Sequence, residues 1–133
     1  AEGQHHVRVV HRGRRDRVES GQEPAVDRSG VVQVVLRDRF AGPHTPATAT
    51  SKAWTAISFR ASTLDLAANS QAGRPASGIR HAPGAILVGG GLTVESRGSM
   101  VGGIGISGAP GGESDDACAR AGIAAIEDKL AFD

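Results

Sequence analysis

Blocks of apolar residues, separated by glycine, proline and polar turns, predict the strands of this chain. Residues 31–36 form a β-branched run that predicts a strand buried on both faces, and the polar turn 27–30 before it indicates a hairpin with the apolar approach at residues 25–26. In the last third, residues 84–91, 92–96 and 100–108 predict three more short strands. Arg97 and Gly98 separate the last two and predict a tight hairpin turn.

Three stretches have the spacing of helices. Thr45 and Pro46 predict the N-cap and first turn of a helix, in which small and branched apolar residues recur on one face: Ala49, Ala53, Ala56 and Ile57. Ser62 predicts the cap of a second, shorter helix over residues 63–71. A terminal helix is predicted over residues 114–130, with a face of small residues that allows it to lie close to a sheet.

The order strand, strand, helix, helix, three strands, helix, with hairpin-length links, predicts an α+β fold with an antiparallel sheet of about five strands. The chain of 133 residues has one Trp, three Phe and no Tyr, so small and branched aliphatic residues must fill its core. Its 19 glycines are about twice the average usage. Such a core favours close approach between backbones.

The stretch 101–116, VGGIGISGAPGGESDD, contains the spacing G-x-G-x-x-G at Gly103, Gly105 and Gly108. A dinucleotide site needs its first glycine in the turn after a strand, and here the first two glycines lie within the predicted strand. The following helix begins with acidic residues, which cap a helix but repel a phosphate. We therefore interpret Gly103 and Gly105 as positions where a neighbouring backbone or a flat ligand comes close.

Charge and cysteine content exclude few partners. Fifteen basic and fourteen acidic residues give a net charge of +1, which argues against a dedicated nucleic-acid surface. No stretch approaches the roughly 18 apolar residues of a membrane-spanning helix. The single Cys118 forms no internal disulfide and leaves both the cytoplasm and secretion after removal of a signal peptide open.

Residues 1–24 differ in composition from the rest and are rich in Arg and His, whereas residues 25–133 are expected to form a single domain. The first segment is interpreted as a solvated tail, as an edge strand at VRVVHR, or as a segment recorded in a different reading frame. A metal site at its three histidines and a phosphate-binding arginine patch are weaker alternatives, because the segment offers no ordered frame.

Four motifs in this order resemble the GlcG/HbpS family of haem-binding and haem-degrading proteins: VDRSGVVQVVLRDRFAGPHT, SKAWTAISFRASTLDL, PGAILVGGGLTV and VGGIGISGAPGGESDDACARAGIAAI. The family also includes the C-terminal domain of some corrinoid adenosyltransferases. The resemblance implies a profilin-like α/β/α fold, haem as cofactor and assembly into homo-oligomers, octamers in some members. Members usually begin with a long amphipathic helix, from which some take a haem ligand, and residues 1–23 do not match it.

A haem site needs an apolar slot, one or two axial ligands and cations near the propionates. His44 and His81 lie in predicted loops beside apolar segments and are the candidate iron ligands. Thr45 is a candidate weak distal group besides its capping role, and three basic residues are propionate candidates: Lys52, Arg60 and Arg80. For each of these residues a surface or capping role is the simpler alternative.

No set of residues predicts protein-based catalysis. Ser107 lacks a completed G-x-S-x-G motif, Cys118 and Met100 are expected to fill space in the core, and Glu113, Asp115 and Asp116 are expected to cap a helix rather than bind a cation. Haem breakdown would therefore depend on bound iron. Two other functions stay open: a domain that binds a metabolite in corrinoid metabolism, and a purely structural unit of an oligomer.

Overall fold

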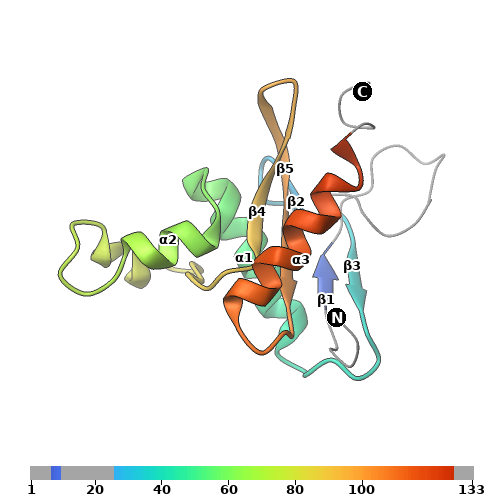
Figure 1. Ribbon diagram of the computed structural model, residues 1–133, viewed down its shortest axis with the longest axis horizontal. Helices are drawn as coiled ribbons and strands as arrows, with labels where there is room; N and C mark the ends of the chain where they lie inside the picture. The colour runs from blue at the N-terminus through green and yellow to red at the C-terminus, as the bar shows by residue number, and fades with distance from the viewer. Residues whose placement is uncertain (1–6, 10–25, 128–133) are drawn as a thin grey trace.

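The computed structural model describes residues 7–9 and 26–127, which form an antiparallel sheet with helices on both faces (Figure 1). The strands are β1 (Val7–Val9), β2 (Val26–Asp27), β3 (Val35–Arg37), β4 (Gly91–Ser96) and β5 (Ser99–Ser107). The helices are α1 (Thr45–Phe59), α2 (Thr63–Asn69) and α3 (Gly112–Ala124), with a short 3-10 helix η1 (Ser77–His81) after α2.

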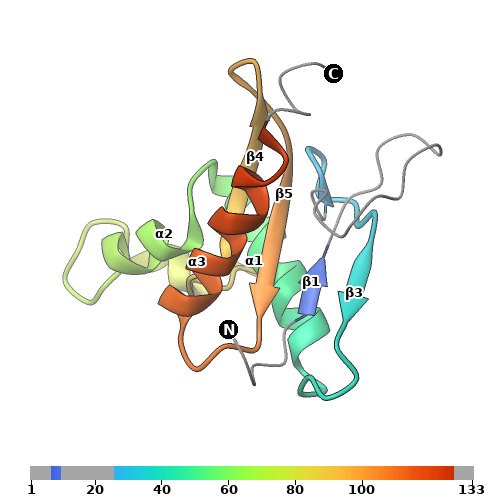
Figure 2. The same ribbon diagram turned by 45° about the vertical axis from the view of Figure 1, so that its right-hand side comes forward.

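The long strand β5 organises the sheet. One edge of β5 pairs with β4 and the other with β1 and β2, and β3 lies beyond β1. Every pairing is antiparallel, which confirms the α+β class and excludes a doubly wound parallel sheet. In two views, α3 lies in front of β4 and β5 while α1 lies behind them (Figures 1 and 2).

Glycines on one face of β5 seat helix α1. A Cβ atom at Gly105 would overlap the carbonyl oxygen of Ala49, and one at Gly103 would lie 2.7 Å from Cγ2 of Ile57. The helix and strand backbones therefore approach closer than any side chain allows. The interpretation of these two glycines as a place for close approach is confirmed, and the neighbour is the backbone of α1 rather than a flat ligand.

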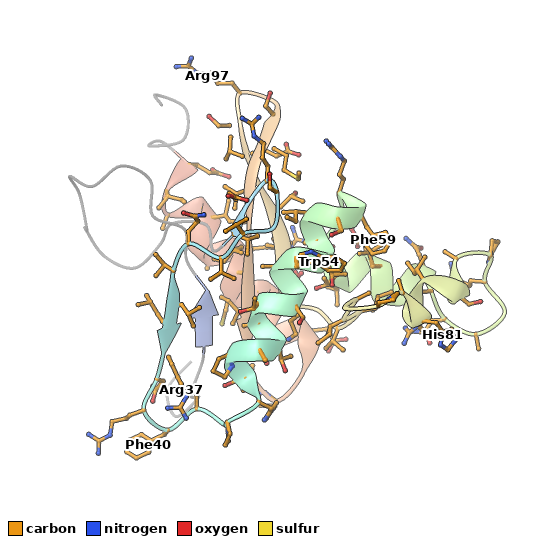
Figure 3. The ribbon with its side chains drawn as sticks, turned by 180° about the vertical axis from the view of Figure 1, so that it is seen from behind. Arg37, Phe40, Trp54, Phe59, His81 and Arg97 are labelled. Atoms are coloured by element: carbon orange, nitrogen blue, oxygen red, sulfur yellow. The ribbon has the colours of Figure 1, made fainter. Side chains whose placement is uncertain are left out.

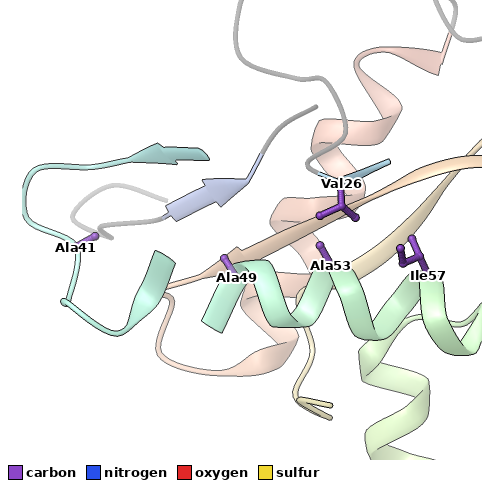
Figure 4. Packing of buried hydrophobic residues seen from close by; sticks show 5 residues of the cluster. All are labelled: Val26, Ala41, Ala49, Ala53 and Ile57. Atoms are coloured by element: carbon purple, nitrogen blue, oxygen red, sulfur yellow. The ribbon is translucent and has the colours of Figure 1, made fainter. Parts of the chain in front are cut away.

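The core is divided between the two faces of the sheet. On the α1 side, a cluster of small and branched residues packs between the helix and the strands (Figure 4): Val26, Ala41, Ala49, Ala53 and Ile57. On the α3 side, alternate residues of β4 and β5 pack against Ala119: Leu92, Val94, Ile104 and Ile106. Because successive strand residues point to opposite faces, the glycines of β5 serve α1 and its isoleucines serve α3.

The sequence correctly predicts several local features. Ser62 caps α2 and its hydroxyl accepts a hydrogen bond from the backbone N–H of Asp65 at 3.1 Å. Arg97 and Gly98 form the β4–β5 turn with φ of 51° and 79°, as a two-residue hairpin turn requires. Met100 packs against the α1-side core, as expected.

Two strand predictions are wrong. Within residues 31–36 only the last two belong to a strand, and Val35 and Leu36 are exposed because β3 lies at the edge of the sheet, beyond β1. Val31 and Val32, which precede β3, are exposed as well. Residues 84–90 form no strand, because their backbone is held by other contacts. Thr55 accepts a hydrogen bond from the N–H of Ile86 at 3.0 Å, and Gly89 packs against the backbone of Gly112.

The ends of two helices also differ from the prediction. His44, not Thr45, is the N-cap of α1, and Thr45 is its first residue, with a hydroxyl that donates to the carbonyl of Gly42 at 2.7 Å. Helix α3 begins at Gly112 and ends at Ala124, with Gly111 as its N-cap and no side-chain cap.

The strand β1 (Val7–Val9) lies between β3 and β5, so it is interior rather than at an edge of the sheet. The other residues of segment 1–24 lie outside the described residues.

No helix among residues 7–9 and 26–127 is long and apolar enough to cross a membrane.

Gly105→Ala is expected to lower the free energy of unfolding by about 3 kcal/mol, because the added methyl group displaces the backbone of α1. Gly78→Ala is the matched control, since a Cβ there meets no atom within 4 Å. Urea denaturation of both variants measures the difference. Equal stability of the two variants would show that α1 is not held against β5 by this contact.

Candidate functional site

Lys52 is buried at the centre of the fold. Its side chain is 2% exposed, and its Nζ donates to Oδ2 of Asp115 and to the carbonyl oxygen of Ile106, both at 3.0 Å. The ammonium group therefore joins α1 to the first turn of α3 and to the end of β5. A cation that is satisfied inside the protein has no free donor at the surface for a propionate group.

Asp115 makes two specific contacts in addition to its favourable interaction with the dipole of α3. Its second oxygen, Oδ1, accepts a hydrogen bond from the N–H of Ala109 at 3.0 Å, so one carboxylate fixes both the loop before α3 and the lysine. The neighbouring Asp116 is also buried and bonds Arg120 at 2.7 Å. Sequence reasoning missed the Lys52–Asp115 pair, because the two residues are 63 positions apart.

The two arginines predicted to bind propionates, Arg60 and Arg80, lie near the two ends of α2. Arg80 donates to the carbonyl oxygens of Ser70 and Ala67 at 2.7 and 2.8 Å, so it closes the C-terminal end of α2. Arg60 is the C-cap of α1, with a left-handed backbone at φ 53°, and its side chain is exposed.

His44 and His81 lie on different parts of the fold. His81 is the last residue of η1, in the lobe that α2 and η1 form at one side of the molecule (Figure 3). His44 directly precedes the first residue of α1, at the opposite end of that helix from Phe59. Both imidazoles are exposed, and the structure does not bring them together in one pocket.

The connection between β3 and α1, which ends at His44, carries residues that the sequence did not single out. Arg37 donates to the carbonyl oxygen of Ala41 at 2.7 Å, and the guanidinium of Arg39 lies 4.5 Å from the ring centroid of Phe40. Arg37 and Phe40 lie together at this end of the molecule (Figure 3). The ring of His44 folds back over Gly42, where a Cβ would lie 2.9 Å from Cε1 of the imidazole.

Exposed apolar side chains are found in the same part of the chain. Phe40, in the connection between β3 and α1, is 61% exposed, and Val35 and Leu36 of β3 are each 43% exposed. An exposed apolar surface beside an imidazole and two guanidinium groups has the chemical composition of one wall of a haem site. The repeated arginines of RDRF in residues 37–40 were the available sequence signal.

The two candidate nucleophiles, Ser107 and Cys118, are not exposed. Ser107 is buried at the end of β5, and Cys118 is partly buried beside the α3-side core. Among the described residues, no group of three or more His, Cys, Asp or Glu side chains is placed to hold a metal ion.

A family model described as haem degrading protein HbpS-like matches residues 24–124. The chain belongs to the HbpS-like family. The match confirms the resemblance drawn from the four motifs and covers the part of the chain that forms β2 to α3. No curated protein matches significantly.

Solved structures agree with the HbpS-like assignment. A double mutant of HbpS from Streptomyces reticuli has a TM-score of 0.75 and 35% identity over 93% of this chain and 73% of its own. A structure titled as a complex of PduOC with haem has a TM-score of 0.75 and 30% identity, over 92% of this chain and 79% of its own. The protein ORFY of Klebsiella pneumoniae, at 23% identity and a TM-score of 0.76 over 92% and 74%, shares the fold.

Lys52→Met is expected to lower the free energy of unfolding by about 3–5 kcal/mol, because Asp115 is left as a buried carboxylate without its cation. The double variant Lys52→Met with Asp115→Asn is expected to recover more than half of that loss, since the asparagine oxygen still accepts from Ala109. Thermal and urea denaturation measure both. A cost below about 1 kcal/mol for Lys52→Met would contradict a buried, paired ammonium.

Proposed function

We propose that this chain binds haem at the surface formed by β3, the 38–44 connection and the start of α1, with His44 as the iron ligand. The observation that carries the proposal is that one short stretch, residues 35–44, brings an exposed imidazole together with exposed apolar side chains and two arginines. Membership of the HbpS-like family, together with the haem complex of the similar PduOC, supports haem rather than another flat apolar ligand.

Each described group has a defined part in this site. Val35 and Phe40 supply apolar surface against which a porphyrin packs, whereas Leu36 points to the opposite face of the sheet. Arg37 and Arg39 supply cations for the propionates, in place of Lys52, whose ammonium is held by Asp115. Thr45 directly follows His44, the proposed iron ligand. Its hydroxyl donates to the carbonyl oxygen of Gly42, so Thr45 contributes by fixing the conformation of the loop.

His81, Arg60 and Arg80 form the second candidate set for the same ligand. They lie around α2, η1 and the end of α1, where the ring of Trp54 packs within 4 Å of a Cβ placed at Gly84. Arg80 is already bonded to two carbonyl oxygens, which leaves fewer of its donors for a propionate group. We therefore assign His44 as the primary ligand and His81 as the alternative.

The proposed wall is open to solvent on the side away from the sheet. A single open wall covers one face of a porphyrin, whereas small-ligand sites normally bury most of the ligand surface. We propose that a second copy of the chain covers the other face, so that haem binding and homo-oligomer formation are linked. A net charge of +1 does not oppose self-association.

Haem, when bound, supplies iron that reacts with oxygen, which is the chemistry needed for haem degradation. The residues of this chain hold the ligand, the apolar face and the propionates. Degradation or iron release would then depend on the bound iron.

Titration with hemin, followed by its Soret absorption, tests this function. The wild-type chain is expected to shift the Soret band with saturation, and His44→Ala is expected to weaken binding at least about tenfold because the iron loses its ligand. His81→Ala is the matched control and is expected to bind normally.

Absence of any Soret shift in the wild type would overturn haem binding. Loss of the shift in His81→Ala with retention in His44→Ala would instead move the iron ligand to η1. Size-exclusion chromatography with and without hemin separately tests the link to oligomer formation.

A further inference from the structure

The strand β4 lies at an edge of the sheet, because it pairs only with β5 among the described strands. The beginning of this edge is closed by α2. The hydroxyl of Thr63 accepts from the N–H of Gly91 at 2.8 Å and faces the carbonyl oxygen of Gly91 at 3.4 Å. The backbone groups of Gly91 therefore point away from β5.

Backbone N–H and C=O groups alternate in direction from one residue of a strand to the next. Those of Thr93 and Glu95 therefore also point away from β5. The register shift after Val94 leaves Val101 of β5 without a partner, so the extra residue lies in β5 and the alternation of β4 is not interrupted. No hydrogen bond within the described residues reaches the outward backbone groups of Thr93 and Glu95. These two residues form a short edge that can pair with another strand.

The open edge lies in a groove of about 590 Å³. One wall is the start of α2 with Ser62 and Asp65, and the other is the second half of α3 with Arg120 and Ile123, followed by Glu127 beyond the end of that helix. Because the edge lies between two helices, the same recessed edge of a second copy cannot approach to pairing distance. A single extended polypeptide segment can.

The charges in the groove favour a basic segment. Three carboxylates line it, from Asp65, Glu95 and Glu127. Of the two guanidinium groups, that of Arg120 is bonded to the buried Asp116, and Arg97 lies at the outer end, at the tip of the β4–β5 hairpin (Figure 3). The rest of the groove therefore has an excess of negative charge, and Leu92 and Ile123 contribute apolar contact.

We propose that the free edge of β4 binds an extended polypeptide segment with basic side chains, which adds to the sheet as a further strand. Backbone pairing with Thr93 and Glu95 engages about five residues of the partner. Lysine or arginine side chains of that segment pair with Asp65, Glu95 and Glu127. This site is separate from the haem surface and does not depend on haem binding.

Fluorescence anisotropy with a fluorescein-labelled heptapeptide of alternating valine and lysine tests the proposal on the full chain. Saturable binding is expected, and methylation of alternate backbone nitrogens in the peptide is expected to weaken it at least about fivefold, because strand pairing is lost. A heptapeptide of alternating valine and glutamate is expected to bind more weakly than the lysine peptide.

Glu95→Lys is expected to weaken binding of the lysine peptide at least about threefold. Glu113→Lys is the matched control, because Glu113 is also exposed but lies in the first turn of α3, outside the groove. Hydrogen exchange gives a second measurement that needs no variant: the amides of residues 93 and 95 are expected to exchange more slowly when the peptide is bound.

Equal binding of the methylated peptide, or unchanged exchange at residues 93 and 95 under saturation, would overturn strand addition. Equal binding of the glutamate peptide would overturn the preference for basic segments. Protection of these two amides in the free protein that increases with its concentration would assign the edge to a second copy and would also overturn the proposal.

Discussion

The fold depends on the contact between α1 and the sheet, where a helix without large side chains lies directly on the glycines of β5. Gly103 and Gly105 remove the side chains that would hold the two elements apart, and Ala49 and Ala53 do the same from the helix. Lys52 then extends from α1 past the strand to Asp115 at the start of α3. A chain with few aromatic residues thus joins three layers through close backbone packing and one buried ion pair. Burying an ion pair costs free energy. The ammonium of Lys52 bonds Asp115 and the carbonyl oxygen of Ile106 only when α1, β5 and α3 are all in place.

This arrangement also determines where ligands can bind. The glycine-rich strand, which in sequence resembles a nucleotide-binding loop, is covered by α1 on one face, while the isoleucines beside the glycines pack against α3 on the other. The outer strands β3 and β4 keep exposed groups at the two edges of the sheet. At β3, apolar side chains and arginines gather beside His44, which is the basis of the proposed haem site. At β4, unpaired backbone lies between carboxylates, which is the basis of the proposed peptide site. The two edges differ in chemistry because β3 carries exposed aliphatic residues and β4 carries Thr93 and Glu95.

The sequence predicted features that depend on neighbours along the chain. The Ser62 cap, the Arg97–Gly98 turn and the Ala49, Ala53, Ile57 stripe follow from local backbone chemistry and helical spacing, and the α+β class follows from their order. The exposure of residues 31–36 depends on how far the helices extend across the sheet, which local hydrophobicity does not indicate. The burial of Lys52 could not be predicted either. Lysine side chains are usually exposed, and it is the distant Asp115 that makes this burial favourable. The arginines and Phe40 near His44 were visible in the sequence, yet nothing along the chain indicated that they share one surface.

Native-state hydrogen exchange tests the central claim most directly, that α1, β5 and α3 are locked together through the glycine contact and the Lys52–Asp115 pair. The account predicts that the most protected amides of α1, of β5 around Ile104, and of α3 around Ala119 open with the same free energy, equal to that of global unfolding. Amides of α2 and η1, which lie outside this unit, are expected to open at lower free energy. Opening of the α1 amides at a free energy well below that of the β5 amides would show that the helix is held independently of the sheet and would contradict the account.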